Sequence, residues 1–218
     1  NCESIELSSN SIHILAGEKR IVYILSDLEK FPMGFGLQSE NPRIATVEPQ
    51  NDRKAILITG NSVGNTSIYL RDLRNPDNFV EIEVVSDYLS GKFIEKGDSS
   101  STWINGGDLH IQEIIESELK EIAKNQTGIL YSFDKDTKAV EIDYSSSDYD
   151  NNKKAGTYEW DKDSLTLNFN NNISKHGFAV VNDHAIIIVL DFTEKYKSKY
   201  PNASVRGAKI QCFLSAIE

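Results

Sequence analysis

The chain has 218 residues, of which 39% are hydrophobic and 9% aromatic, and these fractions are sufficient for buried cores. Its 33 acidic residues outnumber its 23 basic residues, which gives a formal net charge of −10. Because an acidic chain without a Lys/Arg-rich segment is repelled by phosphate backbones, we expect no nucleic-acid partner. The longest apolar run, residues 185–190, is much shorter than a membrane span, so we expect no transmembrane segment.

We interpret residues 1–88 as one domain, because they contain short β-rich segments separated by Gly, Pro, Asn and Asp. Strands are expected at residues 4–7, 11–15, 20–25, 33–38, 44–48, 54–59, 66–72 and 79–85. Apolar and polar residues alternate in two of them, so that Ile68 and Leu70 share one face, as do Ile82 and Val84. This spacing of short strands is typical of an antiparallel β-sandwich.

The segment LQSENPRIATVEPQ, residues 37–50, predicts a corner between two strands. Pro42 lacks a backbone N–H and disfavours the helical conformation at Asn41, so we expect the chain to turn there. The side chains of Ser39 and Asn41 are expected to hold the corner by bonding nearby backbone groups.

This corner resembles a motif of the group 2 bacterial Ig-like domains, which occur in intimin- and invasin-type surface proteins. The motif is Ser-x-Asn-Pro followed by Val/Ile-Ala-x-Val, and here it is Ser39-Glu40-Asn41-Pro42 followed by Ile44-Ala45-Thr46-Val47. The family's Gly-Glu turn and Gly-x-x-x-Ile element match Gly17-Glu18 and Gly64-Asn65-Thr66-Ser67-Ile68. The chain departs from the family at Leu37, where Trp is common, and in residues 48–53, which lack the usual glycine.

The resemblance covers about residues 4–86 and implies an Ig-like sandwich from an exported bacterial protein of the periplasm or outer cell surface. Such domains often act as spacers or adhesion modules. A lipid anchor, upstream of the chain or near Cys2, is compatible with that location.

Residues 89–218 have a different pattern, which indicates an α+β domain with an antiparallel sheet, either an open curved sheet or a small barrel. Residues 87–107 are rich in Ser and Gly, so we expect a linker or loose loop there, with a strand at 92–94 as an alternative for those residues. This half also has a distant likeness to lipocalin-like domains of exported bacterial proteins.

One amphipathic helix is predicted near residues 108–124, with Asp108 as its N-cap and an apolar face made of Ile111, Ile115, Leu119 and Ile122. A short helix is expected at 193–199, and further strands at 178–181, 185–191 and 205–216.

The segments YSFDKDTKAVEI and YEWDKDSLTLNF predict two successive hairpins, each with an Asp-Lys-Asp turn, at residues 134–136 and 161–163. Paired carboxylates suggest calcium, but the other ligands of an EF-hand loop are absent, so we predict turns.

No residue pattern points to catalysis or to a cofactor. The histidines His13, His110, His176 and His184 match no metal-binding motif, and Asp183-His184 is expected to lie in a turn. Cys2 and Cys212 lie at opposite ends of the chain, and we expect them to be either unpaired or joined in an oxidising compartment. We therefore predict no catalytic, cofactor-binding or metal-binding residues, and the ligand-binding residues are unknown at this point.

Five aromatic residues of the second half are of the kind that stacks on sugars or lipids, namely Tyr131, Tyr144, Tyr149, Tyr158 and Trp160. Because they alternate along expected strands, we predict that they belong to the core or to cross-strand pairs. The polar segment 145–154 is a candidate contact surface, with a solvated hairpin tip as the alternative.

Together these features predict a non-enzymatic, exported bacterial protein whose Ig-like module presents a C-terminal binding domain. Its partner would be a glycan, a small apolar ligand or another surface protein. The alternative is a carbohydrate-active enzyme of unfamiliar type with the Ig-like domain as an accessory module. A third hypothesis is a structural subunit that assembles by strand addition.

Overall fold

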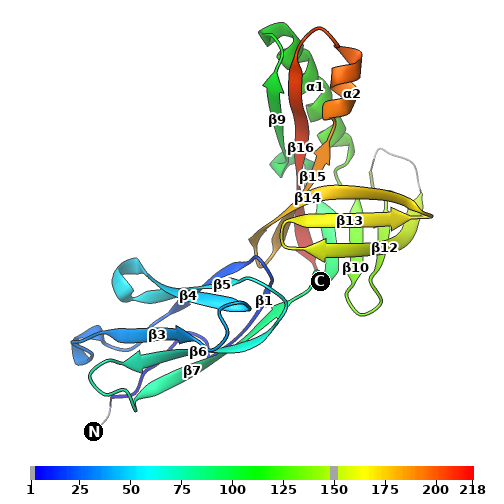
Figure 1. Ribbon diagram of the computed structural model, residues 1–218. Helices are drawn as coiled ribbons and strands as arrows, with labels where there is room; N and C mark the ends of the chain where they lie inside the picture. The colour runs from blue at the N-terminus through cyan, green and yellow to red at the C-terminus, as the bar shows by residue number, and fades with distance from the viewer. Residues whose placement is uncertain (1–2, 148–151) are drawn as a thin grey trace. The chain divides into compact units, whose positions relative to one another are not determined.

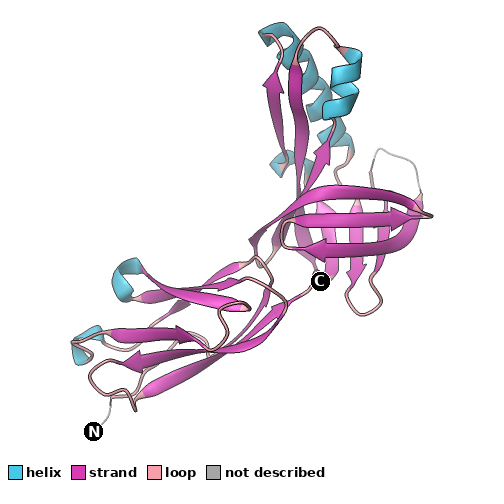
Figure 2. Ribbon diagram, in the orientation of Figure 1, coloured by secondary structure: helices cyan, strands magenta, loops and turns pink. Residues whose placement is uncertain are grey.

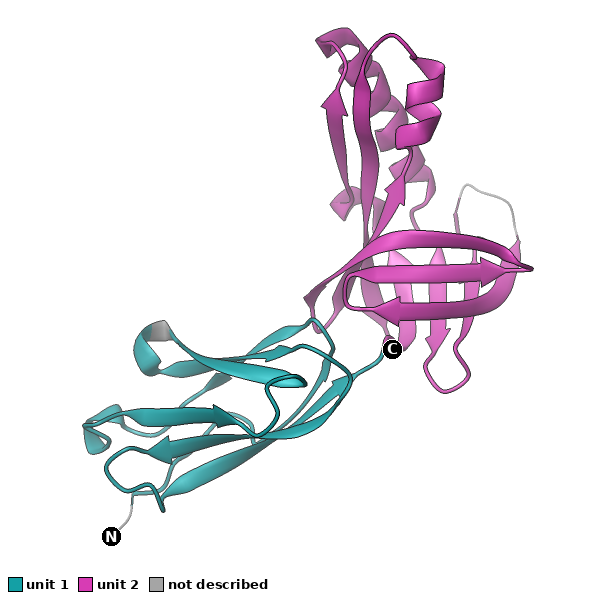
Figure 3. Cartoon of the chain, viewed as in Figure 1, with its two compact units in different colours: residues 1–88 teal, residues 89–218 magenta. Residues whose placement is uncertain are grey.

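The computed structural model describes residues 3–147 and 152–218, apart from the side chain of Asn51. Strands dominate the described chain, which contains two α-helices (Figures 1 and 2). The chain divides into two compact units, Asn1–Tyr88 and Leu89–Glu218 (Figure 3).

From residue 3 onward, the first unit contains seven strands in two sheets. These strands are β1 (Ser11–Leu15), β2 (Lys19–Tyr23), β3 (Phe35–Ser39), β4 (Ala45–Gln50), β5 (Ala55–Gly60), β6 (Gly64–Asp72) and β7 (Phe79–Asp87). One sheet has the order β1-β7-β6-β3 and the other the order β2-β5-β4. Two short 3-10 helices, η1 (Leu28–Lys30) and η2 (Asn51–Arg53), lie in the connections.

A single apolar core joins the two sheets of this unit. Ile68 and Leu70 of β6 and Ile82 of β7 are fully buried, and they pack in one cluster with Ile56 and Ile58 of β5 from the other sheet. The alternation predicted for β6 and β7 is therefore confirmed. Burying both apolar faces against each other removes them from water, which is the main driving force for such a pair of sheets.

Two details differ from the sequence-based expectation. The pair β1–β7 is parallel, whereas all strands were expected to be antiparallel. Parallel pairing requires a long connection, and here β1 and β7 are the first and last strands of the unit. The expected strand at 4–7 is reduced to a single bridge between Leu7 and Ile24.

The corner before β4 is held by the two side chains that the sequence indicated. Ser39 Oγ donates a hydrogen bond to the carbonyl of Ala45 at 2.6 Å, and the backbone N–H of Arg43 donates to Asn41 Oδ1 at 3.2 Å. Both contacts are side chain to backbone, so the corner needs no ladder bond at Pro42.

The described residues of the second unit form nine strands, two α-helices and one 3-10 helix. In chain order they are β8 (Gly91–Glu95), η3 (Gly97–Ser99), β9 (Ser101–Gly106), α1 (Leu109–Asn125), β10 (Leu130–Asp134), β11 (Ala139–Asp143), β12 (Lys153–Asp161), β13 (Ser164–Phe169), β14 (Asn172–Asn182), β15 (Ala185–Asp191), α2 (Thr193–Lys199) and β16 (Val205–Ile217). Eight of the strands close into a barrel, in the order β15-β14-β13-β12-β11-β10-β8-β16 and back to β15. Of the two arrangements expected, the barrel is the one found.

Large side chains fill the barrel interior. Ring centroids of Phe133 and Tyr158 lie 4.9 Å apart, and those of Trp160 and Phe178 lie 5.6 Å apart. The hydroxyl of Tyr158 donates a hydrogen bond to the carbonyl of Leu89. An eight-stranded barrel is about wide enough for its own side chains, so this interior is a packed core.

The thirteen-residue strand β16 connects the barrel to a small helix-covered sheet (Figure 1). One part of β16 pairs with β8, and another part pairs with β9, which lies outside the barrel. Helix α1 packs against β9 and β16, and α2 packs against β16. The strand considered at 92–94 lies within β8, but the linker or loose loop expected for the rest of 87–107 is wrong, because β9 also forms there. Their partners β10 and β16 lie later in the chain, so local composition did not reveal the pairing.

None of the described helices combines the length and apolar composition that crossing a membrane requires.

Candidate functional site

The two Asp-Lys-Asp segments are hairpin turns, as predicted. Asp134 Oδ1 accepts a hydrogen bond from the backbone N–H of Asp136 at 2.9 Å, and Asp161 Oδ1 accepts one from Asp163 at 2.8 Å. These backbone bonds hold the pKa of both acceptor carboxyl groups below the usual range. Across residues 3–147 and 152–218, no three His, Cys, Asp or Glu side chains come together as a metal site.

The other residues considered for chemistry are also placed by the fold. His184 lies in the exposed turn between β14 and β15, with its Nε2 3.1 Å from Asp183 Oδ2. Cys212 is buried on β16, and burial raises the pKa of its thiol, which keeps it protonated and a poor nucleophile. Cys2 lies outside the described residues.

Three of the five candidate aromatic residues, Tyr131, Tyr158 and Trp160, are buried in the barrel, so the prediction of a core role is confirmed for them. Tyr144 is partly buried. Tyr149 lies outside the described residues, as do residues 148–151 of the candidate contact loop.

One buried acid stands out in the barrel. Glu95 on β8 is 1% exposed and accepts a hydrogen bond from the hydroxyl of Tyr131 at 3.1 Å. Burial raises the pKa of Glu95 to about 7, although the Tyr131 hydrogen bond lowers it in part. A pKa near neutrality is common in catalytic acids, but a substrate cannot reach a side chain so deeply enclosed.

An exposed tryptophan lies on the sheet outside the barrel. Trp103 on β9 is 46% exposed. It is the cross-strand neighbour of Lys209 on β16, which in turn is the neighbour of Asp191 on β15. Because directly opposite residues share a face of the sheet, these three side chains form one row across three strands. Lys209 Nζ lies 5.3 Å from the centre of the Trp103 ring.

A glycine fixes the position of this ring. A Cβ atom at Gly207 would lie 2.1 Å from Trp103 Cζ3, so the six-membered ring of the indole rests directly on the backbone of β16. Polar groups surround it on the same face, where Ser101 Oγ lies 3.0 Å from Gln211 Oε1. The opposite face carries the buried residues Ala208 and Ile210. We call the set Ser101, Trp103, Asp191, Lys209 and Gln211 the Trp103 face; Lys209 is partly buried and the other four are exposed.

The first unit contains a cavity of about 340 Å³ between its two sheets. Phe35 and Leu37 of β3 and Leu70 of β6 line it from one sheet, and Pro49 of β4 and Ile56 of β5 line it from the other. Its wall includes three further residues that are exposed, Met33, Arg53 and Leu73. We refer to it as the inter-sheet cavity.

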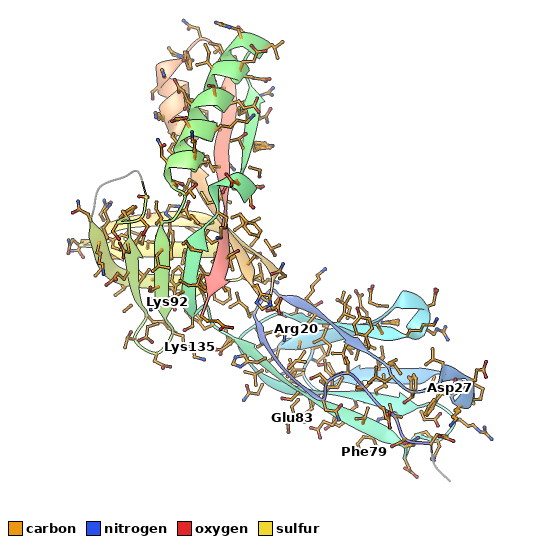
Figure 4. All side chains as sticks on the ribbon, turned by 180° about the vertical axis from the view of Figure 1, so that it is seen from behind. Arg20, Asp27, Phe79, Glu83, Lys92 and Lys135 are labelled. Atoms are coloured by element: carbon orange, nitrogen blue, oxygen red, sulfur yellow. The ribbon has the colours of Figure 1, made fainter. Side chains whose placement is uncertain are left out.

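A second hollow, of about 530 Å³, lies on the barrel along β8, β10, β11 and β12. Lys92, labelled in Figure 4, lines it together with Asp134 and Glu141. Because these exposed charges have both signs, the hollow favours no class of ligand.

Sequence reasoning missed both the Trp103 face and the inter-sheet cavity. The β-branched and aromatic residues Thr102, Trp103 and Ile104 were a signal for a strand, but the surrounding Ser and Gly residues hid it. The cavity draws on residues from five separate segments of the chain, which no local pattern connects. Compared with models of known protein families and with curated proteins, the sequence gives no match.

Proposed function

We propose that this chain is a non-catalytic binding protein of the bacterial periplasm or outer cell surface, and that its second unit binds a glycan on the Trp103 face. In this proposal the first unit is an Ig-like sandwich that acts as a spacer or adhesion module. The corner motif at Ser39 to Val47 and the two sheets around one core support the Ig-like assignment.

The observation that carries the proposal is the position of Trp103. A large aromatic side chain that is 46% exposed loses the benefit of burial, and here Gly207 makes room for it against the strand. The electron-rich face of an indole ring attracts the weakly positive C–H groups on the flat side of a sugar ring. Trp is also the residue type most often found at the energetic centre of interfaces.

The neighbours of Trp103 suit the hydroxyl groups of a sugar. Ser101 and Gln211 carry a hydroxyl and an amide, while Lys209 donates and Asp191 accepts hydrogen bonds. Such mixed donors and acceptors within two strand spacings of an aromatic ring match a polyol better than a purely apolar ligand. The barrel interior is filled by the protein's own side chains, which also favours a ligand that binds on the surface over one that binds inside the barrel.

The alternative, a carbohydrate-active enzyme, would use the same face differently. Glycoside hydrolysis uses two carboxyl groups on either side of the scissile bond. The Trp103 face contributes one carboxyl group, that of Asp191, and hydrogen bonds from Thr193 occupy its Oδ1 atom. Binding without cleavage is therefore the function that this geometry supports best.

Probing the full chain on an oligosaccharide array, followed by calorimetry with the best ligand, tests the proposal. Truncation of a central Trp costs about 2 kcal/mol or more, so Trp103→Ala should weaken binding by at least about thirtyfold. Phe79→Ala is the matched control, because Phe79 is a similarly exposed aromatic residue on β7 of the first unit (Figure 4). An array without signal, or equal affinities for both variants, would refute the proposal.

The location is tested separately by fractionating cells that produce the protein naturally. We expect it in the periplasm or on the outer surface. Recovery from the cytosol would exclude the exported role, whatever the outcome of the glycan measurements.

A further inference from the structure

We propose that the inter-sheet cavity of the first unit is a binding site for a small amphipathic carboxylate, with its apolar chain between the sheets and its carboxylate at Arg53. This inference is independent of glycan binding, because it concerns other residues in the other unit. It gives the first unit a binding activity of its own.

The cavity wall supplies the apolar half of the argument. Leu70 and Ile56 are buried residues of the core, and the cavity reaches both of them from opposite sheets. Phe35 and Leu37 add aromatic and aliphatic surface from β3. A volume of about 340 Å³ is at the lower end of the range of small-molecule pockets, which suits a short chain and not a large ligand.

Arg53 supplies the polar half. Within the described part of the chain, its guanidinium group has no hydrogen bond or ion pair, although the other cavity-lining residues are apolar. Two other arginines of the unit have partners: Arg20 Nη2 lies 2.7 Å from Glu18 Oε2, and the guanidinium carbon of Arg71 lies 4.6 Å from the centre of the Phe79 ring. A lone guanidinium beside an apolar cavity selects an anion, and its planar fork matches a carboxylate in particular.

These two halves predict a specific ranking of ligands. Each additional methylene buried in the cavity should tighten binding about fourfold, until the chain fills the available space. A carboxylate should bind better than an uncharged alcohol of equal length, and an ammonium group should bind worst, because it meets the positive charge of Arg53.

Calorimetry of the full chain with octanoate, decanoate, decanol and decylammonium, each below its aggregation concentration, tests this ranking. Decanoate should bind about tenfold or more tightly than octanoate and than decylammonium. Arg53→Met keeps the apolar stem and should weaken decanoate binding by at least about tenfold. Arg43→Met is the matched control, because Arg43 is exposed in the same unit and does not line the cavity.

The chain also contains its own reporter for the location of the ligand. Met33 lines the cavity and is the single methionine of the sequence. When the chain is labelled with ¹³C-methyl methionine, the NMR signal of Met33 should shift on addition of decanoate, and the titration curve should give the same Kd as calorimetry. The Trp103→Ala variant should behave in the same way. Absence of decanoate binding, equal binding of decylammonium, an unaffected Arg53→Met variant or an unshifted Met33 signal would each overturn the proposal.

Discussion

At the scale of single residues, Glu95 is the side chain whose surroundings determine its chemistry most strongly. Burial raises its pKa to about 7, and the groups nearest to it offer no positive charge. Tyr131 donates a hydrogen bond to it, and the negative charge of Glu95 contributes to the raised pKa values of Tyr131, Tyr144 and Cys212. All three neighbours are thus neutral near pH 7, and ionised Glu95 would be an uncompensated charge.

A pH dependence of stability follows from this arrangement. The pKa of Glu95 is above its ordinary value of 4.5 in the folded state, so the folded state binds more protons between pH 4.5 and about 7. Its contribution to stability is therefore complete below pH 4.5 and is lost as the pH rises through 7. The shift corresponds to about 3 kcal/mol.

Urea unfolding at pH 5 and pH 8 measures this contribution. The unmodified chain should lose more stability between the two pH values than Glu95→Gln, whose amide oxygen still accepts the Tyr131 hydrogen bond. Exposed carboxyl groups with lowered pKa, such as that of Asp134, affect both proteins equally and cancel in the comparison. Equal pH dependence in both proteins would contradict the assignment.

Individual roles could be predicted from the sequence where the partner is close along the chain. Ser39, Asn41, Asp134 and Asp161 bond groups two to six residues away, and each was interpreted correctly as a turn residue. Arg53 was not recognised as a cavity residue, because its apolar neighbours come from distant strands. Local hydrogen bonds leave a local signature, whereas cavities and buried acids do not.

At the scale of elements, helix α1 was predicted almost to its observed ends, because every signal for it is local. Ile115 and Leu119 are fully buried along its apolar face, and Asp108 Oδ1 accepts a hydrogen bond from the backbone N–H of Ile111 at 2.9 Å. The same end of the helix contacts the end of β9, because Gln112 Nε2 donates a hydrogen bond to the carbonyl of Gly106 at 3.0 Å, so the cap also supports the sheet that carries Trp103.

Removing this cap should destabilise the second unit. Asp108→Ala is expected to cost about 1 kcal/mol, because the first turn of α1 loses a side-chain acceptor. Asp108→Asn retains an acceptor oxygen and should remain close to the original stability, which makes it the control. Urea unfolding of both variants gives the comparison. If the Ala variant is as stable as the Asn variant, the cap does not contribute to stability.

Strands β8 and β9 show the limits of element prediction, because only residues 92–94 of β8 were considered as a strand and β9 was missed. Their segment is rich in Ser and Gly, and its composition favoured a loop. Both strands are instead stabilised by partners far along the chain: β8 pairs with β10 and with β16, and β9 pairs with β16. Tertiary pairing therefore outweighed local preference, as is common for strands.

At the scale of the whole molecule, the pairing pattern predicts which fragments fold. Every strand of the first unit pairs within Asn1–Tyr88, and every strand of the second pairs within Leu89–Glu218. The first unit has its own apolar cluster, and the second has the packed barrel interior. A fragment that contains all of its strand partners and its core can fold alone.

A comparison of two cutting positions tests this directly. Fragments 1–88 and 89–218 should each give a dispersed amide NMR spectrum that resembles part of the full-chain spectrum.

The second pair of fragments, 1–107 and 108–218, is cut at the end of residues 87–107, the segment whose composition suggested a linker. The fragment 108–218 should then fail to fold, because β8 closes the barrel between β10 and β16, and without it the two strands keep open edges. A well-folded fragment 108–218 would show that β8 is an accessory strand and that the barrel is not the stable unit.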